Sequence, residues 1–487
     1  TGRPNNINQP YRNLGAVQGL LRSGDVVVYR GGTYFSKIAA SFKNIDGDPN
    51  GIIFMAYPGE QVIFEGAYSI EIANSKNILV DGVVAYCSQT CASTKDPSGQ
   101  LWGSFWGGQV GINLNGNDRI TIQNIEVTRH NRGIWGGFDW GATTIRKVVS
   151  HDNAIEHGIY VPAGDYGGNT FIQHDITVED SILYRNRRWG FQTNGPSDRL
   201  TITRNIIHSN AQGGITFTNG AQNSVISNNL IFNNNQGGIW FFNDNSNQGG
   251  KRSNDNNWIV NNLIWVGSTW NGVCGDGGDW GGTGWIPCSQ GNTKDPSENG
   301  AINFNEGTNT FVYQNTAILN NLLITSSQPP FSVGYIPEIL SQLRHLPTTV
   351  FVKNLFYKTV AQDGTVLWSS MTDGTHTARC GWHQNNNYNY CWSLAGFQQH
   401  QLWPSIQQNI LSDPLVADAS LSYFLTPELF NFDYLQNSPA LNVAVGTPGL
   451  NNMPDVDIRG VSRGVPFDLG AYELRGAQQP PLLVSIT

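Results

Sequence analysis

The chain has 487 residues, of which only 13% are charged and 56 are glycine. This composition suits many tight turns and is poor for long solvent-exposed helices, so strands and turns are expected. A formal net charge of −8 offers no basic surface to a nucleic-acid backbone, and no apolar run reaches the roughly 18 residues of a transmembrane helix.

The chain begins at Thr1 with polar residues rich in Pro and Asn. Such a start is typical of a mature exported protein after removal of its signal peptide, so a secreted, extracellular or periplasmic location is expected. Residues 15–38, GAVQGLLRSGDVVVYRGGTYFSKI, predict a short amphipathic capping helix followed by the first strands. Such a cap would shield the open apolar end of a stack of repeats.

Two groups of oxygen-bearing side chains raise the question of calcium. Asp46, Asp48 and Asn50 followed by Gly51 resemble part of a calcium loop, and Asp276 with Asp279 forms a second group. The first group lacks the bidentate Glu that ends such a loop and fits an ordinary Asp/Asn/Gly turn better. The sequence therefore requires no cofactor, and binding of Ca²⁺ is left open.

The middle of the chain repeats a two-part unit, in which an alternating strand and an Asn-containing turn precede a segment that starts with Gly. The opening glycines are Gly133, Gly158, Gly190, Gly214 and Gly238, at spacings of 25, 32, 24 and 24 residues. Apolar residues alternate with period 2 in each part, which fits a coil of a parallel β-helix and no helical repeat. An asparagine recurs before the Gly-led strand, where stacked amides would form an internal ladder: Asn131, Asn186, Asn210 and Asn234.

Similar units around Gly111 and Gly300 extend the pattern in both directions. We therefore predict an all-β fold, a right-handed parallel β-helix, forming one domain over residues 1–487. Residues 1–70 would form the cap and first coils, 71–360 the central coils, and 361–487 the C-terminal coils with a closing segment.

The six cysteines fall into three close pairs, which are Cys87 with Cys91, Cys274 with Cys288, and Cys380 with Cys391. No CxxC motif or Cys/His cluster supports a metal site. Three local disulfides and an oxidising compartment are therefore predicted.

Two insertions, residues 86–109 and 266–299, interrupt the coils at the same turn. Both contain a cysteine pair, a Trp-rich segment and the sequence TKDPS. They are expected to rise on one side and to wall a groove over the Gly-led strands, with the third cysteine loop, residues 379–392, closing the same side further along. Trp106 and Trp280 belong to these insertions and are predicted to bind sugar, because exposed aromatic patches usually mark binding surfaces.

The residue two positions after each opening glycine is expected to point outward, because side chains alternate across a strand. The resulting column is Asn113, Trp135, Tyr160, Gln192, Thr216, Trp240 and Asn303, and a second column two residues on is Asn115, Gly137, Pro162, Asn194, Thr218, Phe242 and Asn305. Aromatic rings stack on sugar rings and amides bond hydroxyls, which predicts substrate binding by Trp135, Tyr160, Gln192 and Trp240. The alternative is that these rings pack under loops.

Titratable residues cluster in the coils opened by Gly133, Gly158 and Gly190: Arg132, Asp139, Glu156, His157, Asp165, Arg187 and Arg188. Asp139 and Asp165 end the Gly-led strands of adjacent coils, about 4.8 Å apart, which suits the carboxylate pair of a retaining hydrolase, whereas a wider pair suits inversion. Glu156 precedes its glycine by two residues and is expected to face solvent beside His157 as a general acid. Each carboxylate taken alone also fits a solvated turn.

Both ends of the chain resemble the pectate-lyase-like superfamily of parallel β-helix proteins. The opening SGDVVVYRGGTY with IIFMAYPGEQVIFEG is similar to the first coils of secreted members, and the closing DIRGVSRGVPFDLGAYEL to their last coils. The resemblance implies fold and secretion. It does not imply one reaction, because the polygalacturonase, pectate lyase and alginate epimerase signatures are missing from this sequence.

Three functions remain open, and a polysaccharide-cleaving glycoside hydrolase is the leading prediction. A polysaccharide lyase would need a base and a cation beside a uronate carboxyl, which His157, Tyr160 and Arg188 would supply. The shortage of Lys and the neutral rings favour neutral sugars over polyuronate. The third possibility is a glycan-binding surface protein without catalysis.

Overall fold

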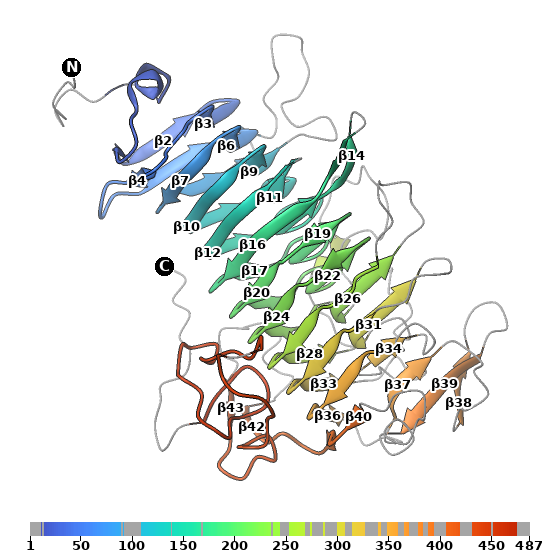
Figure 1. The fold of residues 1–487 in the computed structure, drawn as a ribbon. Helices are drawn as coiled ribbons and strands as arrows, with labels where there is room; N and C mark the ends of the chain where they lie inside the picture. The colour runs from blue at the N-terminus through green and yellow to red at the C-terminus, as the bar shows by residue number, and fades with distance from the viewer. Residues whose placement is uncertain are drawn as a thin grey trace.

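The computed structural model describes residues 11, 14–88, 91, 109–137, 139–166, 169–234, 237–243, 253–267, 273–274, 286–287, 300–306, 314–326, 339–341, 348–358, 365–369, 378–382, 388–393, 406–418, 431–449 and 451–474. Within these ranges the chain is almost entirely strand and turn, and the strands stack into long parallel sheets (Figure 1). No helix in these ranges has the length and apolar character needed to cross a bilayer.

Each coil contributes three strands, and strands at the same position of successive coils pair in parallel. Two of the three positions join into a 24-stranded sheet, called sheet A, because the long strands β10 (Asp118–Thr128) and β12 (Gly141–His151) run through both. The third position forms a 13-stranded sheet, called sheet B. The predicted all-β parallel β-helix is thus confirmed, although a coil has three strands and not two parts.

Sheet B consists of β3 (Ile38–Lys43), β6 (Tyr68–Ala73), β9 (Val110–Asn115), β11 (Arg132–Gly136), β13 (Ile159–Pro162), β18 (Phe191–Asn194), β22 (Ile215–Thr218), β26 (Gly237–Asn243), β31 (Gly300–Glu306), β34 (Ile339–Ser341), β37 (Thr365–Ser369), β39 (Tyr388–Ser393) and β38 (Ala378–Trp382). The last two strands pair antiparallel.

The first position of sheet A consists of β1 (Val26–Tyr29), β4 (Ile52–Ala56), β7 (Lys76–Asp81), β10, β12, β16 (Gln173–Glu179), β19 (Ser197–Asp198), β20 (Thr201–Thr203), β23 (Ala221–Gln222), β24 (Val225–Ser227), β27 (Trp258–Val260), β32 (Ala317–Leu319), β35 (Val350–Val352) and β40 (Ile406–Gln407). The second consists of β2 (Gly32–Phe35), β5 (Val62–Glu65), β8 (Val84–Tyr86), β10, β12, β17 (Ile182–Tyr184), β21 (Ile206–His208), β25 (Leu230–Phe232), β28 (Leu263–Gly267), β33 (Leu322–Ser326), β36 (Leu355–Lys358) and β41 (Ile410–Leu411). Three antiparallel pairs lie outside the coils: β14 (Gly164–Tyr166) with β15 (Asn169–Phe171), β29 (Val273–Cys274) with β30 (Ile286–Pro287), and β42 (Val416–Asp418) with β43 (Asn431–Tyr434).

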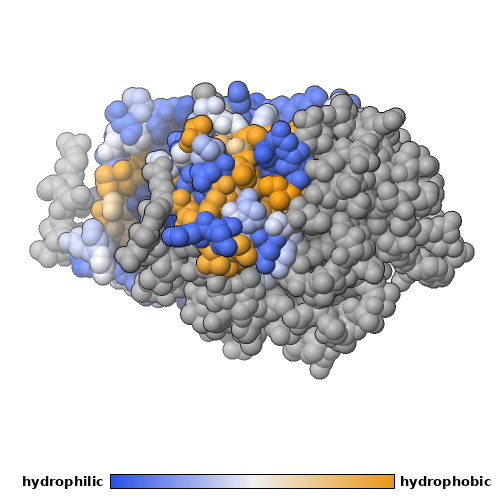
Figure 2. All heavy atoms as spheres, turned by 90° about the horizontal axis from the view of Figure 1, so that it is seen from below, coloured by the Kyte–Doolittle hydropathy of each residue, from blue (hydrophilic) through white to orange (hydrophobic). Residues whose placement is uncertain are grey.

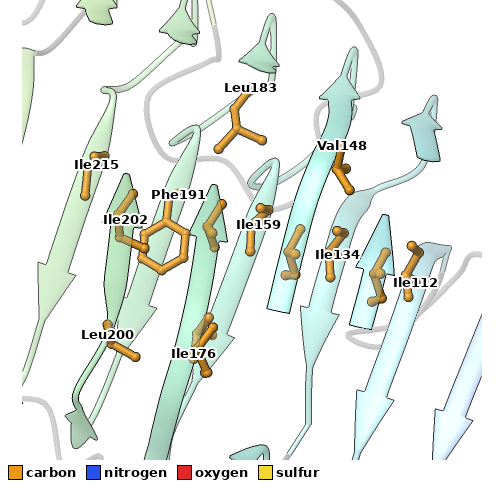
Figure 3. Close-up of a cluster of buried hydrophobic side chains, with 14 of the residues drawn as sticks. Ile112, Ile134, Val148, Ile159, Ile176, Leu183, Phe191, Leu200, Ile202 and Ile215 are labelled. Carbon is orange, nitrogen blue, oxygen red and sulfur yellow. The ribbon is translucent and has the colours of Figure 1, made fainter. Parts of the chain in front are cut away.

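The core is a stack of aliphatic and aromatic side chains that point inward from the three positions (Figure 3). In sheet B the residue after the opening glycine is fully buried in the series Ile112, Ile134, Ile159, Phe191, Ile215 and Ile239, and the series continues with Ile302, two residues after Gly300. Neighbours in this series are register partners on adjacent strands. Burial of such a side chain stabilises the fold by about 1.5–3 kcal/mol, so this period-2 column specifies the register.

The opening glycines recur because each coil passes close to the next at this position. A Cβ atom on Gly133 would lie 2.2 Å from the carbonyl oxygen of Gly158, and one on Gly158 would lie 2.7 Å from that of Gly190. Any larger residue would therefore push adjacent coils apart.

Asparagine ladders satisfy backbone groups in the turns of the coils. In one ladder the Nδ2 atom of each residue donates to the Oδ1 atom of the next, from Asn153 through Asn186 and Asn210 to Asn234, at 2.7–3.0 Å. Asn131 was predicted to belong to this ladder, and that prediction is wrong. In the preceding coil the ladder position is occupied by His130, whose backbone N–H donates to the Asn153 Oδ1 atom. A longer ladder joins residues in the turns between the two strand positions of sheet A: Asn205, Asn229, Asn262, Asn321, Asn354 and Asn409.

The predicted N-terminal capping helix is also wrong. The described residues there form two short 3₁₀ turns, η1 (Leu14–Ala16) and η2 (Gln18–Leu20). The segment is too short to nucleate an α-helix, Gly19 weakens it, and Val17 provides no side-chain cap. Leu14 is nevertheless buried against the core, with Val17 and Leu21 packed beside it.

The closing residues resembling last coils do not add a coil. Residues 431–449 and 451–474 fold back along the outer face of sheet A, where Phe432, Tyr434 and Leu469 pack on strands β25, β28 and β33 (Figure 1). Arg463 is buried there and donates to Asn228 at 2.8 Å. Seen from below, the described surface carries small hydrophobic groups interspersed with hydrophilic ones (Figure 2).

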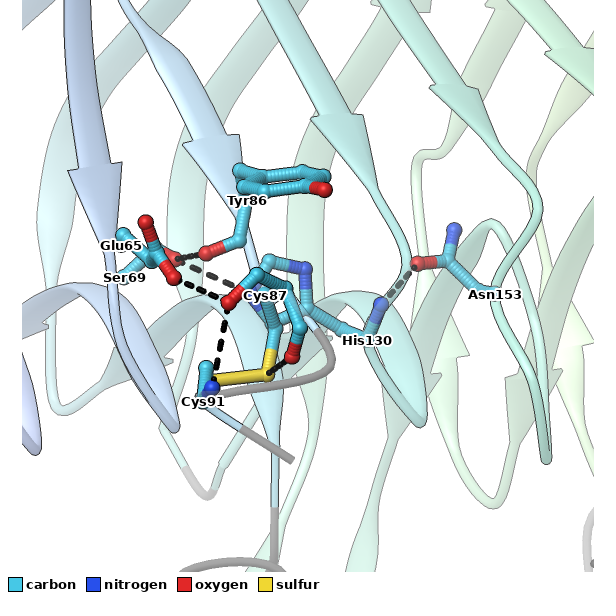
Figure 4. The surroundings of a disulfide bond; sticks show 8 residues. Glu65, Ser69, Tyr86, Cys87, Cys91, His130 and Asn153 are labelled. Atoms are coloured by element: carbon cyan, nitrogen blue, oxygen red, sulfur yellow. Dashed lines mark hydrogen bonds between the residues drawn. A yellow bond between two sulfur atoms is a disulfide. The ribbon is translucent and has the colours of Figure 1, made fainter. Parts of the chain in front are cut away.

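One predicted disulfide is confirmed. Cys87 and Cys91 are bonded at the end of β8, beside Glu65, Ser69 and His130 (Figure 4). The backbones of Cys274, Cys380 and Cys391 lie in β29, β38 and β39, but their side chains and Cys288 lie outside the described residues.

Candidate functional site

The outer face of sheet B carries the predicted column of polar and aromatic side chains. Trp135 is the register partner of Asn113 and Tyr160, and the pairing continues through Gln192, Thr216, Trp240 and Asn303. The second column is also in register from Pro162 through Asn194, Thr218 and Phe242 to Asn305. The fold thus places distant parts of the chain on one wall, about 4.8 Å apart from strand to strand.

Exposure divides the column. Trp135, Tyr160 and Gln192 are partly exposed, whereas Trp240 is buried with 8% of its surface accessible. The Trp240 ring meets Trp189 edge-on, with 5.5 Å between the ring centroids. A Cβ atom on Gly213 would lie 2.1 Å from the Trp189 ring, so this glycine makes room for the indole. Trp189 was missed in the sequence because it precedes its opening glycine and so lies outside both columns.

Arg132 and Glu156 form a buried ion pair between the starts of β11 and β13. Arg132 donates from Nε to Glu156 Oε2 at 2.5 Å and from Nη2 to Oε1 at 2.9 Å. The two residues are 8% and 3% exposed, so the expectation that Glu156 faces solvent is wrong. Burial lowers the pKa of Arg132, but hydrogen bonds to Glu156 and the charge of that carboxylate outweigh this and raise the pKa overall.

His157 is buried as well, with 1% of its surface accessible, which contradicts its expected position on the solvent side. The backbone N–H of Trp189 donates to the Nδ1 atom of His157 at 3.2 Å, so the proton of the neutral ring resides on Nε2. Burial and the positive charges of Arg188 and Arg132 lower its pKa well below the usual value. His157 is therefore neutral at neutral pH.

The Tyr160 ring packs against the His157 ring at 4.8 Å between centroids. Its hydroxyl oxygen accepts a hydrogen bond from Asn194 Nδ2 at 3.1 Å, and Asn219 Nδ2 donates to Asn194 Oδ1 at 3.2 Å, which fixes the orientation of the Asn194 amide. Burial raises the pKa of Tyr160, so the phenol keeps its proton. Since its oxygen already accepts, the Tyr160 O–H is oriented to donate elsewhere.

Two arginines, Arg187 and Arg188, precede β18. Arg188 is partly exposed, and its backbone N–H donates to the Glu156 carbonyl at 3.1 Å. Arg187 is buried and donates to the Ala154 carbonyl at 3.2 Å. Burial and then the charge of Arg188 lower the pKa of Arg187. Arg132, at the start of β11, and Arg188, just before β18, both act electrostatically on His157 and Tyr160.

Asp139 and Asp165 lie at the opposite end of these strands. Asp139 is exposed in the turn after β11, with a φ of 57°. Asp165 lies in hairpin β14–β15, where its register partner is Thr170. This hairpin lies outside the coils, so Asp165 does not occupy the position in the next coil that is equivalent to Asp139. The side chain of Asp165 is outside the described residues, as are Trp106, Trp280, both TKDPS segments and most of the two insertions.

The predicted calcium ligands do not form a metal site in the part of the chain that the structure describes. No group of three His, Cys, Asp or Glu side chains in these residues is placed to hold a metal ion. Asp46 and Asp48 instead form ion pairs with Lys76 at 3.1 and 3.2 Å, and Asp48 also pairs with Arg119 at 2.7 Å. Those cations already neutralise the predicted ligands. Asp276 and Asp279 lie outside the described residues.

Glu71 is a carboxylate on the same face that the sequence did not single out. It extends the outward column by one strand, as the register partner of Asn113, and pairs with Lys43 at 2.9 Å. Its strand lacks the opening glycine that identified the other members of the column.

Residues 103–264 match the family described as the right handed beta helix region. A search of curated proteins finds no match. Among solved structures the chain is similar to a pectate lyase at 12% identity and a TM-score of 0.39, over 97% of this chain and 93% of that one. It is similar to a GH136 lacto-N-biosidase from Eubacterium ramulus at 12% identity and 0.44, over 73% and 62%.

A third similar structure is a PL6 family polysaccharide lyase from Pseudopedobacter saltans, at 13% identity and a TM-score of 0.43, over 82% of this chain and 89% of that one. These structures include both lyases and a glycosidase. The stacked parallel strands of sheets A and B show that the chain folds as a parallel β-helix, in agreement with the match of residues 103–264 to the right-handed β-helix region.

Proposed function

We propose that this protein is a carbohydrate-active enzyme that binds a polysaccharide along the outer face of sheet B and cleaves it. The observation that supports this is the in-register column of Trp135, Tyr160 and Gln192, partly exposed on one wall. A polymer lying across the strands would meet one side chain of this column about every 4.8 Å. Rings would stack on sugars and amides would bond hydroxyls.

Hydrolysis is the reaction that we propose first, with Asp139 and Asp165 as the acid and base or nucleophile. Asp139 lies in the turn after β11, and the backbone of Asp165 lies in the hairpin that follows β13, so both follow the Gly-led strands of adjacent coils. Asp139 is exposed and therefore accessible to substrate, whereas Arg132 binds Glu156 through both carboxylate oxygens. Glu156 is therefore held by Arg132 and takes no part in the proposed proton transfer.

A lyase reaction is the second candidate, favoured by the arginines around Tyr160. Arg188 would neutralise a uronate carboxyl, and the protonated Tyr160 would donate to the leaving glycosidic oxygen. The Nδ1 atom of His157 already accepts a hydrogen bond, so it is poorly placed to act as the base. Elimination needs a base, and His157 does not provide one, so the lyase reaction is less favoured than hydrolysis.

The test is incubation with a broad panel of polysaccharides, measuring new reducing ends and ultraviolet absorbance together. A hydrolase produces reducing ends alone, and a lyase also produces an unsaturated, absorbing end. For hydrolysis, Asp139→Asn and Asp165→Asn are each expected to lower the rate roughly 100-fold or more, the usual contribution of acid–base catalysis.

The matched control is Asp81→Asn, which changes a carboxylate on the outer face of sheet A that hydrogen-bonds Gln123 and Asn124. It should leave the rate unchanged. Full activity in both Asp139→Asn and Asp165→Asn would rule out these two residues as the catalytic pair. If the wild-type protein cleaves no polysaccharide of the panel, catalysis is ruled out and only a glycan-binding role remains.

We also propose that the protein acts outside the cytoplasm. The Cys87–Cys91 disulfide supports this, because such bonds persist in oxidising compartments. The binding partner of the protein would be a polysaccharide. The net charge of −8 on the protein argues against nucleic acid as a partner.

A further inference from the structure

An arginine held by a glutamate against an aromatic ring occurs twice in the described chain. In the first coils, Arg30 donates from Nε to Glu60 Oε2 at 2.9 Å and from Nη2 to Oε1 at 2.5 Å, and the Arg30 Cζ atom lies 4.9 Å from the Tyr57 ring centroid. On sheet B, Arg132 is bound by Glu156 in the same way, and its Cζ atom lies 5.5 Å from the Trp135 centroid.

The two arrangements differ in burial. Side-chain exposure is 43% for Arg30 and 27% for Glu60, but 9% for Arg132 and 4% for Glu156. An exposed pair keeps most of its hydration and contributes little. A buried pair loses hydration of both charges, and apolar residues of similar size often stabilise such a position as well or better. Stability alone therefore does not account for a buried pair between Trp135 and Tyr160.

The geometry of the pair constrains Arg132. Two hydrogen bonds to one carboxylate fix the plane of the guanidinium group, which a single contact would leave free to rotate. The guanidinium covers one face of the Trp135 indole through a cation–π contact, so the orientation of this partly exposed ring depends on Glu156.

We propose that Glu156 is a positioning residue, which fixes Arg132 against Trp135 and thereby sets the orientation of an aromatic sugar subsite on sheet B. This inference rests on the proposed function, since it assigns a task within the same surface. The carboxylate accepts two charge-assisted hydrogen bonds and acts as an acceptor, not as a proton donor to substrate.

The test is fluorine NMR of the full chain labelled with fluorotryptophan, with the Trp135 signal assigned from its loss in Trp135→Phe. Spectra are recorded before and after addition of four soluble polymers: hydroxyethyl cellulose, galactomannan, polygalacturonate and alginate. Retardation in gels containing the same polymers measures binding, and cleavage is assayed in parallel.

Glu156→Gln is expected to move the Trp135 signal and to weaken binding of the polymer that wild type retains by roughly tenfold, as loss of a cation–π contact allows. The control Glu60→Gln breaks the exposed Arg30 pair and should leave both readouts as in wild type. Glu156→Gln leaves the buried charge of Arg132 without its carboxylate partner, and this variant can misfold. The double variant Arg132→Met with Glu156→Leu, which removes both charges, is therefore measured too. It should recover the unfolding midpoint without recovering binding.

The proposal is overturned if Glu156→Gln leaves the Trp135 signal and binding unchanged, or if the apolar double variant binds as wild type does. It is also overturned if a polymer that wild type cleaves does not move the Trp135 signal, a result that would still support the proposed function. Failure of the proposed function gives a different result. In that case the wild-type protein neither binds nor cleaves any of the polymers, whatever effect Glu156→Gln has on the Trp135 signal.

Discussion

His151 lies between two carboxylates on the outer face of sheet A. Its Nδ1 atom contacts Asp152 at 2.6 Å and its Nε2 atom contacts Glu126 at 3.1 Å. Burial lowers the pKa of His151, but the hydrogen bonds to Asp152 and Glu126 outweigh it, so the pKa is raised overall. Protonated His151 therefore binds both carboxylates more favourably in the folded chain than in the unfolded one.

A pH-dependent stability follows from this contact. A histidine whose pKa is raised on folding stabilises fully below its unfolded pKa, near 6.5, and the stabilisation is lost as pH rises through the folded value. His151→Gln should therefore lower the urea unfolding midpoint more at pH 6 than at pH 9. His174→Gln, at an exposed contact with Asp175, is the control and should have a small effect at both. Equal losses at the two pH values for His151→Gln would contradict this.

Individual side chains also show where sequence reasoning reached its limit. The position of Glu156 two residues before a glycine predicted an outward carboxylate, but its burial depends on Arg132 in the preceding coil. Such a contact joins residues 24 apart, and a local pattern does not contain it. The direction of Trp135 was predictable because alternation along a single strand decides it.

Asparagine ladders are the elements that join one coil to the next at the turns. Asn210 is fully buried, accepts from the backbone N–H and the Nδ2 atom of Asn186, and donates to the Leu183 carbonyl. Asn210→Ala leaves these buried groups without partners at about 1–3 kcal/mol each, so we expect a loss of about 3 kcal/mol or more in unfolding free energy. Urea denaturation of the variant measures this.

The control for the ladder is Asn50→Ala, at an exposed turn. It should change the unfolding free energy by less than about 0.5 kcal/mol, as is usual for surface positions. Comparable losses in Asn50→Ala and Asn210→Ala would show that the ladder contributes nothing specific.

Strands and their register were predictable, whereas turns were predicted less well. Inward residues such as Ile134, Ile159 and Phe191 alternate with outward ones, and the opening glycines mark where coils meet. The choice between Asn131 and Asn153 for the ladder could not be made, because both are turn asparagines and only the stacking of coils selects one. Hairpin β14–β15 was missed for a related reason, since it lengthens one coil without breaking the strand pattern.

At the scale of the whole molecule, the coils build one continuous wall on sheet B and a partly covered wall on sheet A. The C-terminal segment covers sheet A through contacts such as Arg463 with Asn228, which are 235 residues apart. Its sequence resembles closing coils, and no periodicity marks the place where it docks. The repeat therefore predicts the stack but not the covering segment.

The central claim is that polysaccharide lies on the column of Trp135, Tyr160 and Gln192. Hydroxyl-radical footprinting of the wild-type chain, with and without a polymer from the panel that it binds, tests this most directly. We predict protection of Trp135 and Tyr160 with no change at the exposed Phe35 and Tyr57 of the first coils. Protection confined to those first-coil residues, or a polymer bound without protection of Trp135 and Tyr160, would contradict the account.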